Sequence, residues 1–108
     1  MLKGGEMFAR VTMLEIDTVR INLNTALERF KEAVLPELRK QAGYKGLYVL
    51  STPEGKGLLL SLWETEEAAE AGVGSGYYDE QVAKFITLLR QPPGRDHYQV
   101  VFAEAPSP

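Results

Sequence analysis

The chain has 108 residues, a net charge of −3 at neutral pH and no cysteine. Its length fits one domain, so we predict a single domain over residues 1–108, with loose ends at 1–6 and 105–108. The lack of cysteine excludes disulfides and a thiolate metal site, and the one histidine, His97, cannot alone supply an ordinary transition-metal ligand set.

Charge and hydropathy also narrow the expected partners. The 12 Lys and Arg residues are scattered and form no cationic stripe, which argues against binding to nucleic acid. No apolar run approaches the roughly 20 residues that span a bilayer, and the polar N-terminal residues lack the core of a signal peptide. We therefore expect a cytoplasmic protein with no membrane or nucleic-acid partner. No metal or flavin motif is present, so we also expect no metal and no cofactor.

Two different apolar periodicities indicate the first strand and the first helix. Residues Phe8–Ile16 alternate between two faces, as a strand does. Asn24 suits the N-cap of the following helix, Pro36 predicts a kink near Leu35, and Gly43 is predicted to end the helix at its C′ position. Apolar residues recur on one face of this helix, at Leu27, Phe30, Val34 and Leu38.

A hairpin and then a broken helical segment follow. Tyr44–Ser51 and Leu58–Trp63 have strand character, and the turn between them contains proline and glycines. Thr65 is the expected N-cap of a short acidic helix. Glycines 72, 74 and 76 separate this short helix from a second one over Tyr77–Leu89, and His97–Ala103 is the predicted last strand.

This order of elements predicts the fold class. It reads β-α-β-β-α-β, the ferredoxin-like α+β pattern with a four-stranded antiparallel sheet, here with the second helix broken in two. The helices of such a fold cover only one face of the sheet.

Both faces of the predicted sheet are apolar, which favours a dimer. Leu58, Leu60 and Leu62 lie on one face of the third strand, and Leu59 and Trp63 lie on the other. Exposing several large side chains costs several kcal/mol, at roughly 25 cal/mol per Å² of apolar surface. A second copy packed sheet to sheet in an isologous homodimer removes this cost. The alternative is a monomer with a partly exposed sheet.

Several short segments resemble one known family. They are Phe8–Val11, Leu35–Arg39, Gly43–Gly46, Leu60–Glu67 and Tyr98–Val101. On these segments the chain resembles the antibiotic-biosynthesis-monooxygenase type of domain in the dimeric α/β-barrel superfamily. The resemblance extends from about residue 8 to residue 102. It implies a sheet-to-sheet dimer, a dimeric α/β barrel, with a pocket between sheet and helices in each subunit.

The resemblance also bears on activity. Some members of this family oxygenate aromatic polyketides without metal or flavin, others degrade haem, and many have no assigned activity. Haem-degrading members use an asparagine on the first strand, a tryptophan at the end of the hairpin strand and a histidine on the later helix. Only the tryptophan has a match here, Trp63, so the resemblance disfavours haem degradation. It equally disfavours the processing of signalling molecules, which also relies on the helix histidine.

Three aromatic residues are candidates for the site. Trp63 could form a pocket wall that stacks on a planar substrate, or it could close the core with its N–H bonded to a backbone carbonyl. Tyr77 and Tyr78 follow glycines that could let a pocket lid move, and a phenol there could donate a hydrogen bond to a developing enolate oxygen. The alternative places Tyr78 in the core and Tyr77 on the surface.

Two further candidates are polar. His97 could act as a base, since its ordinary pKa near 6.5 suits proton abstraction, or it could be a half-exposed residue at the start of a strand. Arg10 lies among apolar neighbours in the first strand, where a charged side chain requires an ion-pair partner or a role in ligand binding. It could bind an anionic or phenolic oxygen in the pocket, or pair with a carboxylate, including one across the dimer.

The sequence thus predicts Arg10, Trp63 and Tyr78 as substrate-binding residues and Trp63, Tyr77 and His97 as candidate catalytic residues. We expect a homodimer that binds a small apolar or aromatic compound and oxidises it as a cofactor-independent monooxygenase. The alternative is a non-catalytic dimeric module with a ligand-binding or structural role.

Overall fold

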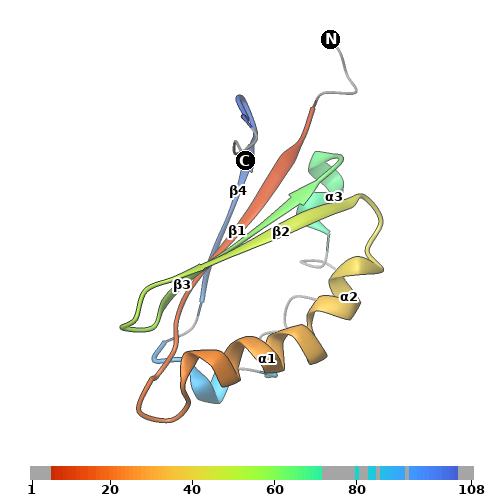
Figure 1. Cartoon of the computed structure of the whole chain (residues 1–108). Coiled ribbons are helices and arrows are strands. Elements are labelled where there is room, and N and C mark those ends of the chain that lie inside the picture. The colour runs from red at the N-terminus through yellow and green to blue at the C-terminus, as the bar shows by residue number, and fades with distance from the viewer. Residues whose placement is uncertain (1–5, 72–79, 81–82, 85, 92, 105–108) are drawn as a thin grey trace.

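The computed structural model describes residues 6–71, 80, 83–84, 86–91 and 93–104. Its strands, labelled in Figure 1, are β1 (Phe8–Glu15), β2 (Tyr44–Ser51), β3 (Lys56–Trp63) and β4 (Gly94–Gln99). Its helices are α1 (Leu23–Ala33), α2 (Leu35–Arg39), α3 (Glu66–Glu70) and a 3₁₀ helix at Ile86–Leu88. None of the helices in this part of the chain combines the length and apolar character that a membrane-spanning helix needs.

The sheet confirms the predicted ferredoxin-like fold. Its four strands lie in the order β2-β3-β1-β4, and every pair of neighbours is antiparallel. β2 and β3 form the predicted hairpin, while β1 lies between β3 and the last strand of the chain. β2 and β4 are therefore the two edges of the sheet.

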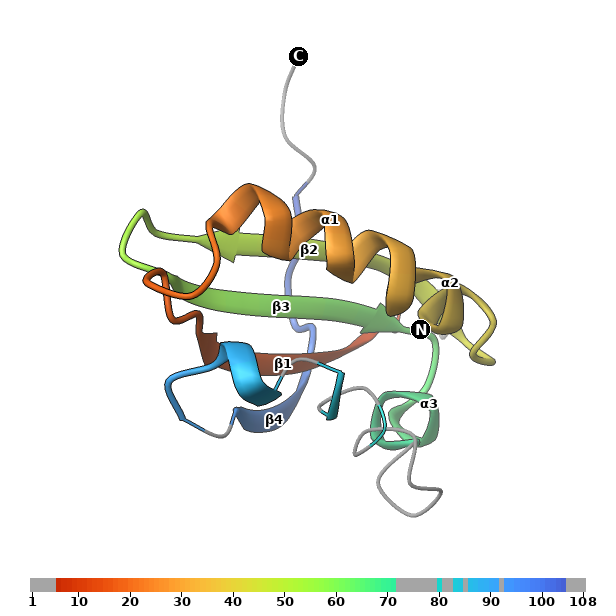
Figure 2. The same cartoon turned by 90° about the horizontal axis from the view of Figure 1, so that it is seen from below.

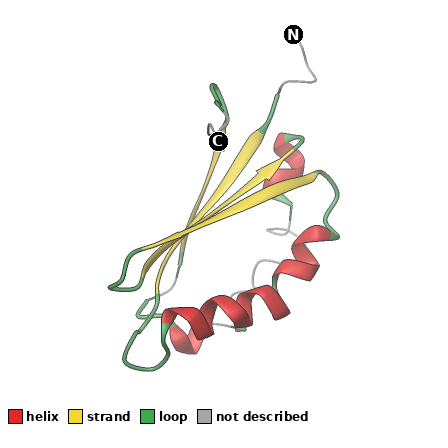
Figure 3. Ribbon diagram, viewed as in Figure 1, coloured by secondary structure: helices red, strands yellow, loops and turns green. Residues whose placement is uncertain are grey.

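The helices lie on one side of this sheet. Figures 1 and 3 show the strands nearly edge-on, with α1 and α2 on the same side. Figure 2 shows α1 running alongside β2 and β3. The face turned toward the helices is the one that carries Arg10, Thr12 and Leu14 of β1.

The first helix differs from its predicted bounds at both ends. Its N-cap is Asn22 rather than Asn24, because the Asn22 side chain accepts a 2.8 Å hydrogen bond from the Thr25 N–H. Starting here lets the first turns of α1 pack on buried Ile16 and Ile21. The predicted kink near Leu35 is confirmed as an interruption of the helix, since α1 ends at Ala33, α2 begins at Leu35, and Val34 caps both.

The predicted role of Gly43 as a helix C′ residue is wrong. The C-cap of α2 is Lys40, and Gly43 lies three residues later, in the turn before β2. Its φ of +82° is in the left-handed region, and a Cβ there would lie 2.8 Å from the Ala68 Cβ. Gly43 is therefore needed for the close approach of α3 rather than for the end of α2.

The last strand was predicted three residues too late. β4 covers Gly94–Gln99 rather than 97–103, because its pairing with β1 ends where Phe8 faces Gln99. Beyond that point the Val100 N–H still donates to the Met7 carbonyl, and the chain then leaves the sheet. The predicted second helix falls largely outside the described residues, which place a 3₁₀ helix at its C-terminal end.

The buried core consists of two clusters. One joins α1, α2, β3 and α3, and the other joins the end of β1 to the start of α1. The first contains Phe30, Val34, Leu38, Trp63 and Ala69. The second contains Ile16, Ile21 and Ala26.

The face of the sheet turned away from the helices is also apolar, as predicted. The strand register places Val11 beside Leu60, and Met13 beside Leu58. Tyr48 and Leu50 extend these two rows onto β2, and Tyr98 lies on the same face of β4. The large side chains at the margins stay uncovered, with Met13, Tyr48, Leu50 and Tyr98 between 46% and 58% exposed. We refer to this surface as the open face.

The hairpin turn depends on Gly55. This residue is buried, has a φ of +101°, and lies so close to β1 that a Cβ would be 2.5 Å from the Ile16 carbonyl oxygen. We expect Gly55→Ala to lower the free energy of unfolding by about 1–3 kcal/mol, because both the backbone and the end of β1 would have to shift. Urea unfolding followed by Trp63 fluorescence measures this change.

Gly94→Ala is the matched control. A Cβ at Gly94 would meet only the Met13 Cε, at an ordinary 3.5 Å. Its stability should stay within about 0.5 kcal/mol of the unsubstituted chain. Equal stabilities for the two variants would contradict the role assigned to Gly55.

Candidate functional site

A cavity of about 300 Å³ lies between α1 and the sheet. Its wall follows the whole of α1, from Leu23 to Phe30, and continues through Val34 to Leu38 of α2. The sheet closes the other side with residues of β1, β2 and β3. Val34, which separates α1 from α2, also lies in this wall.

Most of the described lining is apolar, with five polar side chains. These are Arg10 and Thr12 on β1, Ser61 on β3, Ser51 on β2 and Asn24 on α1. Arg10 and Ser61 are direct neighbours across the β1–β3 pair. They make the end of the cavity near α3 polar, while Ser51 and Asn24 lie toward the other end, near Leu14 and Leu23.

Arg10 is the most unusual of these residues, because it carries a charge and is only 6% exposed. Its Nη1 donates hydrogen bonds to the carbonyls of Ala69 (3.2 Å) and Ala71 (3.1 Å), at the end of α3. Its guanidinium carbon lies 4.6 Å from the centre of the Trp63 ring, as in a cation–π contact. Arg10 therefore ties α3 to the sheet and brings positive charge to the cavity wall.

Trp63 is fully buried, at 1% exposed, and is not among the residues that line the cavity. Its indole Nε1–H donates a 2.8 Å hydrogen bond to the Ser61 hydroxyl, rather than to a backbone carbonyl as the core alternative predicted. Ser61 Oγ in turn donates to the Arg10 carbonyl at 3.3 Å. Trp63 thus supports the cavity wall from behind, through Ser61 and Arg10.

Tyr44 completes this aromatic cluster. Its ring contacts Trp63 edge-on, with centroids 5.5 Å apart. Burial raises the pKa of the Tyr44 phenol, and the positive charge of Arg39 partly opposes that shift. The phenol is therefore neutral at physiological pH, which suits its place beside the indole.

The remaining predicted site residues are not brought to the cavity by the described structure. His97 lies within β4 rather than at its start, directly across from Arg10, and is solvent-exposed. It is absent from the described cavity lining. Tyr77 and Tyr78 fall outside the described residues.

Sequence reasoning missed Thr12 and Ser61 as site residues. Both interrupt apolar strands, as Arg10 does, and that interruption was the available sign. Only the register could show that Ser61 faces Arg10 and belongs to the same row.

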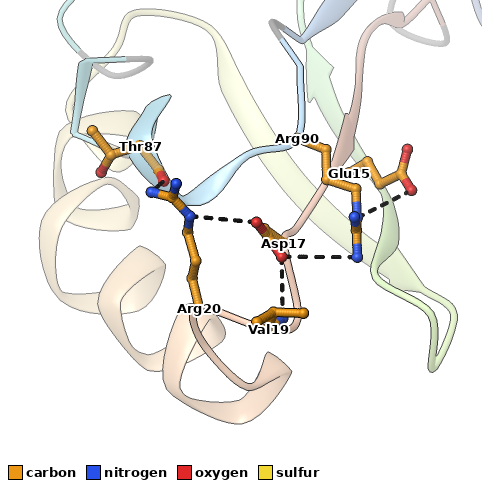
Figure 4. Close-up of polar contacts among 6 residues, drawn as sticks. All are labelled: Glu15, Asp17, Val19, Arg20, Thr87 and Arg90. Carbon is orange, nitrogen blue, oxygen red and sulfur yellow. Dashed lines mark hydrogen bonds and ion pairs between the residues drawn. The ribbon is translucent and has the colours of Figure 1, made fainter.

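An ionic cluster lies at the end of the cavity that is remote from Trp63, next to the lining residues Ile16 and Leu89 (Figure 4). Asp17 is its centre: the carboxylate accepts the Val19 N–H at 3.1 Å and faces Arg20 at 3.4 Å and Arg90 at 3.8 Å. Arg90 also pairs with Glu15, and Arg20 donates to the Thr87 carbonyl. The cluster fastens the end of β1 to the segment that precedes β4.

The polar groups of the described lining are hydroxyls, one amide and one guanidinium. The described lining contains no Asp, Glu, His, Cys, Tyr or Lys side chain. Within the same part of the chain, no three His, Cys, Asp or Glu residues lie together as a metal site requires. An apolar molecule would fit such a cavity, with one oxygen turned toward Arg10 and Thr12.

Comparison with known proteins gives structural matches only. No family model matches the sequence, and no curated protein matches it either. A protein of unknown function from Nitrosomonas europaea is similar in structure, with 19% identity, 97% of this chain and 99% of that chain covered, and a TM-score of 0.71.

Two other solved structures have the same fold. One is a monooxygenase from the gene ActVA-Orf6 of Streptomyces coelicolor, in complex with nanaomycin D, at 21% identity, 93% and 92% coverage of the two chains, and a TM-score of 0.72. The other is a dimeric ferredoxin-like protein from an uncultured marine organism, at 11% identity, 98% and 97% coverage, and a TM-score of 0.69. At such identities the likeness concerns the fold, and at that level it confirms the predicted resemblance to the antibiotic-biosynthesis-monooxygenase type of domain.

The Ser61 hydroxyl should be important for stability. We expect Ser61→Ala to lower the free energy of unfolding by about 1–3 kcal/mol, because the buried indole N–H of Trp63 would lose its acceptor. Chemical denaturation measures the loss. Ser51→Ala, at an exposed position of β2, is the control and should leave stability nearly unchanged. A Ser61→Ala variant as stable as this control would show that the hydrogen bond contributes nothing.

Proposed function

We propose that this chain forms a homodimer that binds a small apolar or aromatic molecule between α1 and the sheet and oxidises it without a cofactor. The main support is the cavity of about 300 Å³, with a mostly apolar lining and a few hydrogen-bonding groups. Sites for small molecules commonly have this volume and composition. The Streptomyces monooxygenase, whose structure holds nanaomycin D, supports the oxidative part by analogy of fold.

In the proposed reaction the substrate itself supplies the electrons. An anthrone, for example, would lose two hydrogens from its CH₂ group, gain a carbonyl oxygen from O₂ and release the second oxygen atom as water. The protein would hold the molecule, exclude water and stabilise the enolate oxygen that precedes electron transfer. Arg10 and Thr12, which follow one another on the cavity face of β1, are suited to that last task.

A second candidate function is binding without catalysis. It is favoured by the absence of any carboxylate, imidazole or phenol from the described cavity lining. The roles of Tyr77, Tyr78 and His97 stay predictions, as do the cytoplasmic location and the single-domain extent of the chain.

A variant that fills the cavity tests both candidates. Thr12→Phe places a ring in the middle of the cavity floor, whereas Thr25→Phe adds the same ring at an exposed position of α1. We expect the first variant to bind N-phenyl-1-naphthylamine, a neutral fluorescent probe, at least about tenfold more weakly than the unsubstituted chain, because the volume it needs is occupied. The second should bind it normally.

Oxygen consumption with anthrone separates the two functions. Uptake of O₂ by the unsubstituted chain and by Thr25→Phe, but not by Thr12→Phe, would establish oxidation in the cavity. Probe binding without O₂ uptake would favour the binding module. Equal probe binding by all three chains would refute the cavity as the site.

The open face supports the dimer. It places Met13 and Leu58 in the same row as Leu50 of β2, and Met13 and Leu50 are 46% and 52% exposed. Contiguous exposed apolar surface of this kind marks an interface. A second copy, related by a two-fold axis, would cover the face with an identical one.

A charge on the open face should separate the subunits. We expect the unsubstituted chain to sediment at micromolar concentration with twice the 12.0 kDa mass of one chain. Met13→Glu should sediment as one chain, because dimerisation would bury the new carboxylate without a partner. Val19→Glu, 88% exposed in the connection between β1 and α1, should remain a dimer. A monomeric unsubstituted chain would contradict the proposal.

A further inference from the structure

We propose that the cavity between α1 and the sheet binds an amphiphile. Its anionic oxygen lies between Arg10 and Thr12, and an unbranched alkyl chain extends from there toward Ile16. This inference rests on the proposed binding site and deepens it, because it names the class of ligand. It does not depend on whether that ligand is oxidised.

The cavity is long and narrow. On the sheet side its lining runs from Arg10 to Ile16, about 20 Å at about 3.3 Å per residue. On the helix side it runs from Leu23 to Leu38, about 22 Å at about 1.5 Å per residue. A volume of about 300 Å³ over this length leaves a mean cross-section of about 15 Å², whereas a compact cavity of that volume would be about 8 Å across. Such a shape suits an extended chain better than a fused ring system.

The middle of the cavity is apolar and unfilled. The core cluster around Trp63 lies at the Arg10 end, and the cluster around Ile16 lies at the opposite end. Between them, Leu27 of α1 and Val49 of β2 line the cavity but belong to neither cluster. Figure 2 shows α1 and β2 running alongside one another over this stretch. Unfilled space with apolar walls favours an apolar ligand over water.

The Arg10 end is the place for an anionic oxygen. Arg10 is the one charged side chain of the described lining, and no carboxylate accompanies it there. Thr12 follows on the same face of β1, and its hydroxyl makes no hydrogen bond within the part of the chain that the structure describes. An anionic oxygen would accept a hydrogen bond from this hydroxyl and lie close to the positive charge of Arg10.

The remaining length of the cavity fits a chain of medium length. From Thr12 to Ile16 the cavity floor extends about 13 Å. An extended alkyl chain covers this distance with about ten carbons, at about 1.25 Å per carbon for a C–C bond of about 1.5 Å. Asn24 and Ser51, the polar lining residues toward this end, are exposed. The far end therefore opens to solvent, and a longer chain would project into water.

Calorimetric titration with sodium alkanoates from hexanoate to dodecanoate tests the chain. We expect the affinity to rise about threefold to fourfold with each added CH₂ group, because each one buries apolar surface in the cavity. The rise should level off near ten carbons, where the chain reaches the open end. Affinity that does not depend on chain length, with normal binding of N-phenyl-1-naphthylamine, would overturn the alkyl chain and leave the cavity as a binding site.

Variants at the far end should affect long chains alone. Leu23→Trp narrows the cavity there, and Leu89→Trp narrows the same end from another segment if the first variant does not fold. We expect either variant to bind decanoate at least about tenfold more weakly and hexanoate within about twofold of the unsubstituted chain. Thr25→Trp, at an exposed position of α1, is the control and should bind both normally.

A variant at the head position should affect every chain length equally. Thr12→Val removes the hydroxyl and keeps the shape of the side chain, so each alkanoate should bind about five- to tenfold more weakly. Thr12→Ser keeps a hydroxyl and should restore most of the affinity.

The two patterns of loss locate the two ends of the ligand. A loss that depends on chain length for Thr12→Val and is uniform for Leu23→Trp would overturn the proposed orientation. Affinity that rises with chain length but is unaffected by all the cavity variants would place the chain elsewhere and overturn the inference. Failure of the unsubstituted chain to bind either the alkanoates or N-phenyl-1-naphthylamine would overturn this inference together with the proposed binding site.

Discussion

A sheet that is apolar on both faces must be buried on both, and the helices of this chain lie on only one face. The rest of the structure follows from how the two faces are used. On the helix face, α1 stands off the sheet and leaves a cavity instead of a packed layer. On the open face, two rows of side chains running across β2, β3 and β1 stay partly uncovered. One face thus suits a small molecule, and the other suits a second copy of the chain.

The buried guanidinium of Arg10 connects the core cluster around Trp63 with the wall of the cavity. Placing a charge in an apolar interior is costly unless the group is hydrogen-bonded. Here the guanidinium donates hydrogen bonds to the carbonyls at the end of α3 and lies over the ring of Trp63. Ser61 accepts a hydrogen bond from the indole and donates one to the backbone of β1. The same side chain that fastens α3 to the sheet therefore also determines where the cavity is polar. A contribution to stability and a contribution to binding coincide in one residue.

The strands were predictable because their signal is local. Tyr44–Ser51 has the same bounds in the sequence analysis and in the structure, and the hairpin follows from the short turn beside it. The cap of α1 was not predictable, since Asn22 and Asn24 are equally good caps and only packing on Ile21 separates them. The extent of the last strand depended on where its partner β1 begins, which lies about 90 residues away along the chain.

The site was predictable in part, because some of its residues stand out in the local sequence whereas their arrangement depends on strand pairing. A charged residue in an apolar strand drew attention to Arg10, and a single tryptophan at a strand end drew attention to Trp63. Their actual arrangement required the register, which places Ser61 between them and turns the indole away from the cavity. His97 faces Arg10 across the strands, yet it lies on the edge strand and is exposed there.

The two ends of the cavity are stabilised by different interactions, and this determines which end opens more readily by local unfolding. At the Trp63 end, aromatic and aliphatic side chains exclude water, so dissolved ions have little influence there. At the Asp17 end, the pairs with Arg20 and Arg90 are solvent-accessible, worth about 0–1 kcal/mol each, and weakened by ionic strength. Amide hydrogens around residues 15–20 should therefore exchange with solvent sooner than those beside Trp63, and added salt should widen the difference.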